Sequence, residues 1–213
     1  MKIFLIVIGV LALLLACGII WMGMPKGPSL EEVAHLRSPR IVEMGPQKVL
    51  LVRAKGNPNE VGPEAFGLLM RTYFSLQGVP KRGPDFKSPR ARWPVDAEIP
   101  QEEWEGLYAM PVPESVTEIP ERSTEGGLSM ELVTWEYGEV AEILHVGRYD
   151  EEPPTVEALM EFIADQGYVV SGQHEEDYLK GPGFLFAGKP DNYLTIIRYP
   201  VTKVESSGGQ EVG

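Results

Sequence analysis

The side chains best suited to chemistry in this chain are an acidic run beside a histidine and a scattered set of aromatic rings. The run His174-Glu175-Glu176-Asp177 offers an imidazole and carboxylates that could coordinate a cation, although a solvated acidic loop is the simpler interpretation. The other two histidines, His35 and His145, lack metal-ligand spacing, and His145 fits an ordinary position within an apolar strand. We therefore expect no metal and no cofactor.

Motifs for other chemistries are missing from the sequence. It contains no G-x-S-x-G nucleophile turn, no G-x-G-x-x-G and no Walker pattern. The net charge of −12 argues against nucleic acid as a partner, because phosphate binding needs clustered excess Lys and Arg. A single cysteine, Cys17, excludes a disulfide framework and a Cys-based zinc site.

The aromatic rings are the stronger candidates for a binding surface, because a ring offers flat apolar area with a polar tip. Trp104 and Tyr108 are four positions apart in a predicted strand, so they share one sheet face, as do Tyr193 and Ile197. If that face packs under helices, the same rings are core. The candidates are Trp93, Trp104, Tyr108, Tyr149 and Tyr193.

The elements that would position these rings occur twice. At one constant offset, Gln77-Gly78 falls on Gln166-Gly167, Trp104 on Tyr193, and Pro111-Val112 on Pro200-Val201. The repeats cover residues 40–113 and 128–202. Such internal similarity predicts two copies of one supersecondary unit.

Each repeat has the pattern β-β-α-β-β. Apolar alternation predicts strands at 40–44, 48–54, 104–110, 128–137, 139–146 and 193–199. One helix has Pro63 at its first position and ends at Gly78; the other is capped by Thr155 and ends at Gly167. We expect an α+β fold in which one antiparallel sheet carries two helices on one face, with a pseudo-twofold axis and a groove between the repeats.

An apolar segment precedes the repeats. Residues 3–24 are uncharged, and at about 1.5 Å per residue they match a bilayer core of about 30 Å, which predicts one transmembrane anchor. Alternatively, Leu14-Leu15-Ala16-Cys17 resembles a bacterial lipobox, in which Cys17 would carry the lipid. Either form places the body beside a membrane. The basic residues after the span favour the cytoplasmic side, whereas the Lys2 head before an apolar run favours export, which we prefer.

Two flanking segments and a basic segment within the first repeat complete the organisation. Residues 25–39 are predicted to be a linker, and residues 203–213 a disordered polar tail. A basic segment within the first repeat fits a solvated loop. Because each basic residue beside an anionic membrane contributes about 1 kcal/mol, it is also a candidate lipid contact. Its residues are Lys81, Arg82, Lys87, Arg90 and Arg92.

Several of these motifs together resemble the GyrI-like small-molecule-binding family, which includes the effector-binding domains of AraC- and MerR-type regulators. The motifs are His145-Val146-Gly147-Arg148-Tyr149, Gln166-Gly167 and Ile197-Arg198-Tyr199-Pro200-Val201. The resemblance covers about residues 40–202. It implies a duplicated α+β module with an aromatic ligand groove between the repeats, often with a buried acidic residue. It places the family's turn tyrosine on Tyr149, and some members are described as hydrolases.

One departure from the family matters for function. The family often has a glutamate four residues before the closing proline, where this chain has Leu107 and Ile196. We therefore expect a groove for a neutral, apolar or amphipathic ligand, and no enzyme relying on that glutamate. The alternatives are a hydrolase using Tyr149 with Glu131 or Glu136, and an adaptor whose own side chains fill the groove. The predicted lining is Tyr149, Trp104, Tyr193, Trp93, Tyr108, Leu107 and Ile196.

Overall fold

The computed structural model describes residues 27–94, 100–120, 127–182 and 188–204. The predicted membrane anchor at 3–24, the alternative lipid site at Cys17 and most of the polar tail lie outside these residues and stay predictions. Among the helices that the structure describes, none is long and apolar enough to cross a membrane.

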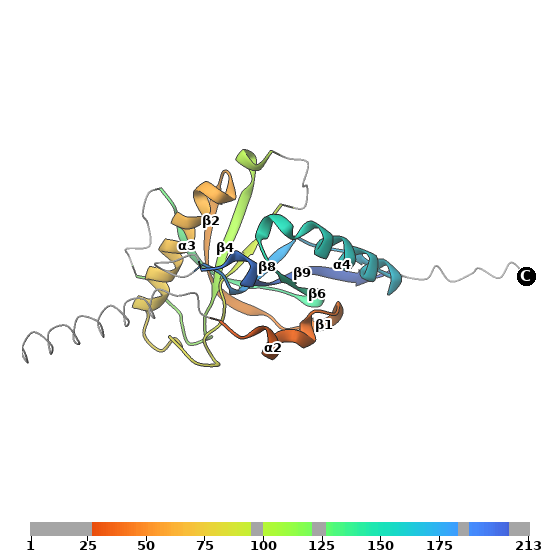
Figure 1. The fold of residues 1–213 in the computed structure, drawn as a ribbon. Helices are drawn as coiled ribbons and strands as arrows, with labels where there is room; N and C mark the ends of the chain where they lie inside the picture. The colour runs from red at the N-terminus through yellow and green to blue at the C-terminus, as the bar shows by residue number, and fades with distance from the viewer. Residues whose placement is uncertain (1–26, 95–99, 121–126, 183–187, 205–213) are drawn as a thin grey trace, which may run out of the picture.

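A sheet of nine antiparallel strands runs through the described residues (Figure 1). The strands predicted from apolar alternation are all present, and three short strands, β3, β7 and β8, join them. In chain order the strands are β1 (Arg40–Met44), β2 (Gln47–Lys55), β3 (Arg90–Arg92), β4 (Glu105–Pro111), β5 (Met130–Trp135), β6 (Gly138–Val146), β7 (Tyr168–Val170), β8 (Glu175–Lys180) and β9 (Leu194–Lys203).

The strand order carries the predicted symmetry. It runs β1-β6-β9-β8-β3-β4-β2-β5, with β7 paired to β9. From one edge of the sheet the order is β1, β6, β9 and β8, and from the other edge the equivalent strands of the other repeat follow as β5, β2, β4 and β3. The pseudo-twofold axis therefore passes between β3 and β8. The first strand of each repeat pairs with the second strand of the other repeat: β1 pairs with β6, and β5 pairs with β2.

Two helices, α3 (Pro58–Ser75) and α4 (Pro153–Asp165), cover the same face of the sheet, as predicted (Figure 1). Helix α3 buries Leu69 and Tyr73 with the strand residue Val52 of β2. Helix α4 buries Leu159 with Ile197 of β9. Cross-strand pairing places these sheet residues in one row, so both cores lie on one side, called here the helix face.

Both helices begin earlier than the sequence predicts. Asn57 caps α3 by accepting a hydrogen bond from the Asn59 amide, and Pro58 follows it, so Pro63 lies inside the helix. Helix α4 begins at Pro153, and the expected cap Thr155 instead hydrogen-bonds His145 at 2.9 Å. The predicted ends agree better, since a glycine with positive φ follows each helix within three residues of its last.

Part of the predicted linker belongs to the folded body. Ser29 and Glu32 form a capping box that starts the short helix α2 (Leu30–Val33). The following turn buries Leu36 against Leu144 and Leu194 on the sheet face opposite the helices, called here the back face. In Figure 1 α2 accordingly lies across the sheet from α4.

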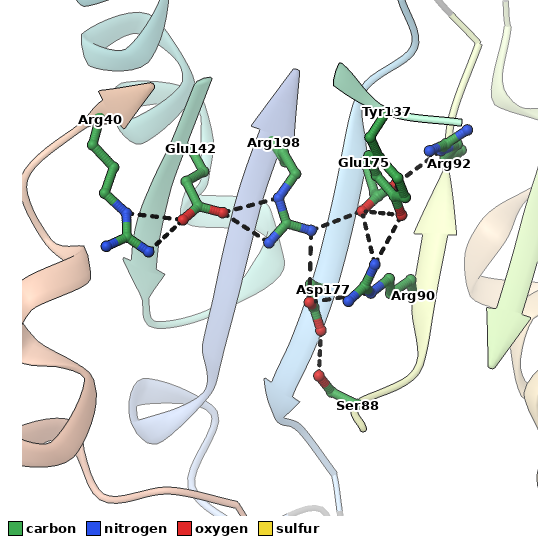
Figure 2. Close-up of polar contacts among 9 residues, drawn as sticks. All are labelled: Arg40, Ser88, Arg90, Arg92, Tyr137, Glu142, Glu175, Asp177 and Arg198. Atoms are coloured by element: carbon green, nitrogen blue, oxygen red, sulfur yellow. Dashed lines mark hydrogen bonds and ion pairs between the residues drawn. The ribbon is translucent and has the colours of Figure 1, made fainter. Parts of the chain in front are cut away.

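A row of alternating charges crosses five strands of the back face (Figure 2). Its members are direct cross-strand neighbours, so each arginine faces a carboxylate on the next strand. From β1 to β3 they are Arg40, Glu142, Arg198, Glu175 and Arg92.

The distances in this row are those of close ion pairs. Arg198 lies 2.8 Å from Glu142 and 2.8 Å from Glu175, and Arg92 lies 2.8 Å from the other oxygen of Glu175. Asp177 pairs with Arg90 at 3.2 Å and accepts a hydrogen bond from Ser88. Although burial opposes it, the surrounding carboxylates raise the pKa of Arg198.

These contacts correct two sequence-based interpretations. The run 174–177 is not a solvated loop, because Glu175, Glu176 and Asp177 are buried in β8. Arg90 and Arg92 are held by those carboxylates in β3, so they are not free to contact lipid headgroups. Of the predicted lipid contacts, Lys81, Arg82 and Lys87 are exposed, and lipid binding by them stays untested.

We expect the substitution Arg198→Met to lower the free energy of unfolding by about 3–5 kcal/mol, because it leaves Glu142 and Glu175 buried with fewer partners. The matched control Arg53→Met breaks the half-exposed pair with Glu131 and should cost about 0–1 kcal/mol. Urea unfolding followed by tryptophan fluorescence measures both. Equal costs would show that the buried row contributes no more than a surface pair.

Candidate functional site

The two repeats meet at a short seam of three residue pairs between β3 and β8. Arg90 faces Asp177 and Arg92 faces Glu175 on the back face, whereas Ala91 faces Glu176 on the helix face. Alternation therefore brings one carboxylate of the acidic run to the helix face. Its cross-strand neighbour is a small alanine, so space for other side chains remains above it.

Glu176 is the centre of the candidate site. Its side chain accepts a hydrogen bond of 2.5 Å from Trp93 Nε1 and another from the Tyr178 hydroxyl. The residue is only 9% exposed. Burial raises the pKa of Glu176, and the hydrogen bonds from Tyr178 and Trp93 partly offset that rise because they stabilise the ionised carboxylate.

A second buried acid comes from the start of α4. Pro153 begins the helix and leaves Glu152 at the N-cap position, 7% exposed, without the usual side-chain cap hydrogen bond. Burial raises the pKa of Glu152 to about 9, and the charge of Glu176 adds to the effect. Glu152 Oε1 has no hydrogen-bond partner among the described residues. This carboxyl group therefore holds a proton at neutral pH.

His174 completes the polar cluster. Its ring stacks on Tyr199 with a centroid distance of 4.9 Å, and its Nε2 lies 3.8 Å from Glu176 Oε1. Burial lowers the pKa of His174 to about 4, so the imidazole is neutral. Its Nε2 also has no hydrogen-bond partner among the described residues.

The three side chains can act together. One ligand atom from each of Glu152, His174 and Glu176 lies within 4.8 Å of the other two. Two carboxyl groups and a neutral imidazole can bind an organic cation, hold a metal ion, or transfer protons. The expectation of no metal site rested on spacing along the chain, and the structure brings Glu152 to His174 from a different element.

Aromatic rings surround the acids. Tyr149, in the 3-10 turn before α4, lies 5.7 Å from the ring of Tyr178 and 5.4 Å from that of Tyr193. On the other side, Trp93 lies 5.6 Å from Tyr108 and 6.0 Å from Trp104. Because Tyr149 is 40% exposed, the ring cluster reaches the surface there. Burial raises the pKa of Tyr149, which keeps its hydroxyl group protonated.

A glycine makes the packing of the first-repeat rings possible. A Cβ on Gly106 would lie 2.7 Å from the Tyr108 ring and 2.9 Å from the Trp93 ring. The absence of a side chain therefore lets both rings approach the backbone of β4 at Gly106. Tyr108 itself is buried beneath Phe66 of α3, at a centroid distance of 5.0 Å. It is a core ring that borders the site.

The structure thus brings together five of the predicted lining residues, and two others lie elsewhere. Leu107 packs with Val49 and Leu51, and Ile196 packs with Leu36, all on the back face. Because successive strand residues point to opposite faces, Leu107 and Ile196 are turned away from Tyr108 and Ile197. They do not line the site, so the prediction that they do is wrong.

The carboxylates proposed from the sequence for hydrolysis are not at the site either. Glu131 pairs with Arg53 at 2.8 Å, and Glu136 is exposed after β5. The acids near Tyr149 are instead Glu152 and Glu176, whose charges both raise its pKa. Alternation through 174–178 was the signal that could have revealed Glu176, since it places His174, Glu176 and Tyr178 on one face.

A surface hollow described in the structure lies in the second repeat and not at the seam. Its lining includes Ile143, His145 and Thr155, with Glu151 at its border. Both ring nitrogens of His145 are already engaged, one by Thr155 and the other by the Arg148 carbonyl at 2.9 Å. This agrees with the sequence-based interpretation of His145 as an ordinary sheet residue.

No protein-family model matches the chain, and no curated protein matches it. Solved structures do. An uncharacterized conserved protein from Listeria innocua is 22% identical and covers 81% of this chain and 98% of its own, with a TM-score of 0.63. A hydrolase from Listeria innocua is 21% identical over 81% and 98% of the two chains, with a TM-score of 0.60. The EcmrR C-terminal domain is 16% identical over 78% and 98%, with a TM-score of 0.57.

At these identities the comparisons establish the fold alone. They agree with the GyrI-like effector-binding fold that the sequence resembles, and the Listeria innocua and EcmrR C-terminal chains are each covered almost completely. The absence of a nucleic-acid partner stays a prediction. What the site does must be argued from its own residues.

The raised pKa of Glu152 predicts how stability depends on pH. A carboxyl group that binds its proton more tightly when folded stabilises the protein fully below its unfolded pKa, near 4.5, and loses that contribution as pH rises towards about 9. We therefore expect the unfolding free energy of the wild type, relative to Glu152→Gln, to fall between pH 5 and pH 9. Urea unfolding with a chelator present measures this difference. A difference that is constant or rises with pH contradicts the assignment.

Proposed function

We propose that this chain binds a small molecule at the ring-and-carboxyl site formed by Glu176, Glu152 and the surrounding tyrosines. The observation that carries the proposal is the buried carboxylate of Glu176, held by Trp93 and Tyr178 next to an unpartnered oxygen of Glu152. Burying a carboxyl group without a cationic side chain beside it is costly, and such groups are typical of binding sites.

The chemistry of the site favours an organic cation with aromatic or apolar parts. The carboxyl group of Glu176 can pair with a cation, and the rings of Tyr149, Tyr178 and Trp93 supply faces that attract cations. The sequence suggested a neutral ligand because Leu107 and Ile196 replace the family's glutamate. That reason no longer applies, because the carboxylate is provided by Glu176 on β8.

The entrance that we infer is at Tyr149. Its ring is the exposed member of the cluster and lies against Tyr178, which in turn touches Glu176. A ligand entering there would meet Tyr149 first and the carboxylates last. The apolar residues 3–24 support the further proposal that this site lies beside a membrane, where amphipathic cations concentrate.

Hydrolysis of a small molecule is the second candidate. Two structures of similar fold are titled hydrolases from Listeria innocua. Here the specific observation is a pair of neighbouring buried carboxyl groups, Glu152 and Glu176, because two such groups with different proton affinities are what a general acid and a general base require. A structural adaptor filled by its own side chains is less well supported, since two polar atoms of the site lack partners within the described residues.

Binding of crystal violet, a triarylmethane cation, tests the proposal. We expect the full chain in detergent micelles to bind it, and Glu176→Gln to weaken binding at least tenfold, about 1.4 kcal/mol. Glutamine keeps an acceptor for Trp93 and Tyr178, so the fold is preserved while the charge is lost. Equilibrium dialysis measures the affinities.

The matched control is Glu151→Gln, which removes one exposed charge next to the site. It should leave the affinity for crystal violet unchanged, and it corrects for dye held by the micelles. Neutral leucocrystal violet should bind more weakly than the cation. Equal binding by the wild type and Glu176→Gln would overturn the proposed role of Glu176.

A further inference from the structure

We propose that Glu152, His174 and Glu176 form a binding site for a first-row divalent metal ion such as Zn²⁺. The inference goes beyond the proposed small-molecule binding, because it requires His174 and assigns the two carboxyl groups to one ion. It rests on how three elements converge, namely the start of α4, the residue preceding β8, and β8 itself.

The ligand set has the chemistry of a metal site. Imidazole nitrogen and carboxylate oxygen are both ordinary ligands of Zn²⁺. One such atom from each residue lies within 4.8 Å of the other two, a separation that a central ion can span with bonds of about 2.0–2.2 Å after small side-chain adjustments. Three protein ligands leave a position for water or a small molecule, as in catalytic rather than structural zinc sites.

Unpartnered atoms provide an independent reason. Glu152 is 7% exposed, and its Oε1 has no hydrogen-bond partner among the described residues. His174 Nε2 also lacks a hydrogen-bond partner among these residues. Buried polar atoms without partners are uncommon in folded proteins, and a bound ion is one of their recognised explanations. Both atoms belong to the residues of the cluster, so one ion would satisfy them together.

Neighbouring side chains hold the ligands in place. Trp93 and Tyr178 orient the Glu176 carboxylate by hydrogen bonds, and Tyr199 fixes the ring of His174 by stacking. Such supporting contacts are typical of metal sites because they set the direction of each ligand.

Two variants remove ligands with little change of shape. Glu152→Gln matches the protonated form of the carboxyl group, and His174→Phe keeps the aromatic stack on Tyr199. The control Glu151→Gln makes the same substitution at an exposed neighbouring position. Circular dichroism and urea unfolding show whether each variant is folded before its affinity is compared.

The experiment is calorimetric titration of Zn²⁺ into the untagged full chain in detergent micelles, without any organic ligand. We expect one ion per chain in the wild type and in Glu151→Gln, and at least about tenfold weaker binding in Glu152→Gln and His174→Phe. Co²⁺ should give a visible absorption band that disappears in His174→Phe. Mg²⁺ should not compete, because it prefers oxygen ligands in octahedral geometry.

Three results would overturn the metal site: no Zn²⁺ binding by the wild type, equal affinity in all variants, or equally tight binding of Mg²⁺. Equal affinity would mean that the ion binds elsewhere, for example at His35. The metal site can be disproved without disproving the binding of an organic cation, because the titration uses no dye and His174→Phe leaves Glu176 in place. Crystal violet binding that survives in His174→Phe while Zn²⁺ binding is lost supports both proposals.

Discussion

The pairing of β3 with β8 is the interaction on which the rest of this structure depends. Only three residue pairs join the repeats there, and two of them are arginine–carboxylate pairs on the back face. A one-residue slip would exchange the faces of every side chain in β8. It would bury Glu175 and Asp177 under the helices and leave the arginines unpaired. Buried ion pairs add little net stability, but they penalise wrong pairing strongly. We conclude that the charge row fixes the register between β3 and β8, and that this register places Glu176 on the helix face.

The helix face consequently contains buried polar groups of a kind that is unusual in a protein core. Two carboxyl groups and a neutral imidazole meet among aromatic rings, and no described arginine or lysine pairs with them there. On the back face every buried carboxylate of the row has a guanidinium partner. Carboxyl groups therefore have guanidinium partners on one side of the sheet, whereas the described residues provide no such partner on the other. Local violations of this kind are typical of functional sites, where the remaining structure supplies the stability.

Duplication explains the scaffold but not the site. The strand order is symmetric, yet Ala91 of the first repeat stands opposite Glu176 of the second. At the start of the helices the same difference recurs, since Asn57 caps α3 through its side chain and Glu152 occupies the cap position of α4 without doing so. The second repeat supplies the acids and the histidine, whereas the first supplies Trp93. An asymmetric ligand or ion can thus be held by a pseudo-symmetric fold.

Local pattern in the sequence determined the long elements, because alternation and helical periodicity report burial of neighbouring residues directly. The longer strands of both repeats and the glycines that follow the helices were predictable in this way, whereas Tyr178 and Tyr199 were not among the predicted lining residues. The strands β3 and β8 were not predictable, since the three residues of β3 carry too little periodicity and the acidic residues that begin β8 resemble a solvated loop. Leu107 and Ile196 were placed wrongly because a family position fixes a strand but not its exposed face. The ion pairs and the meeting of Glu152 with His174 join residues that are distant in sequence, so only the packing of the strands and α4 in three dimensions could decide them.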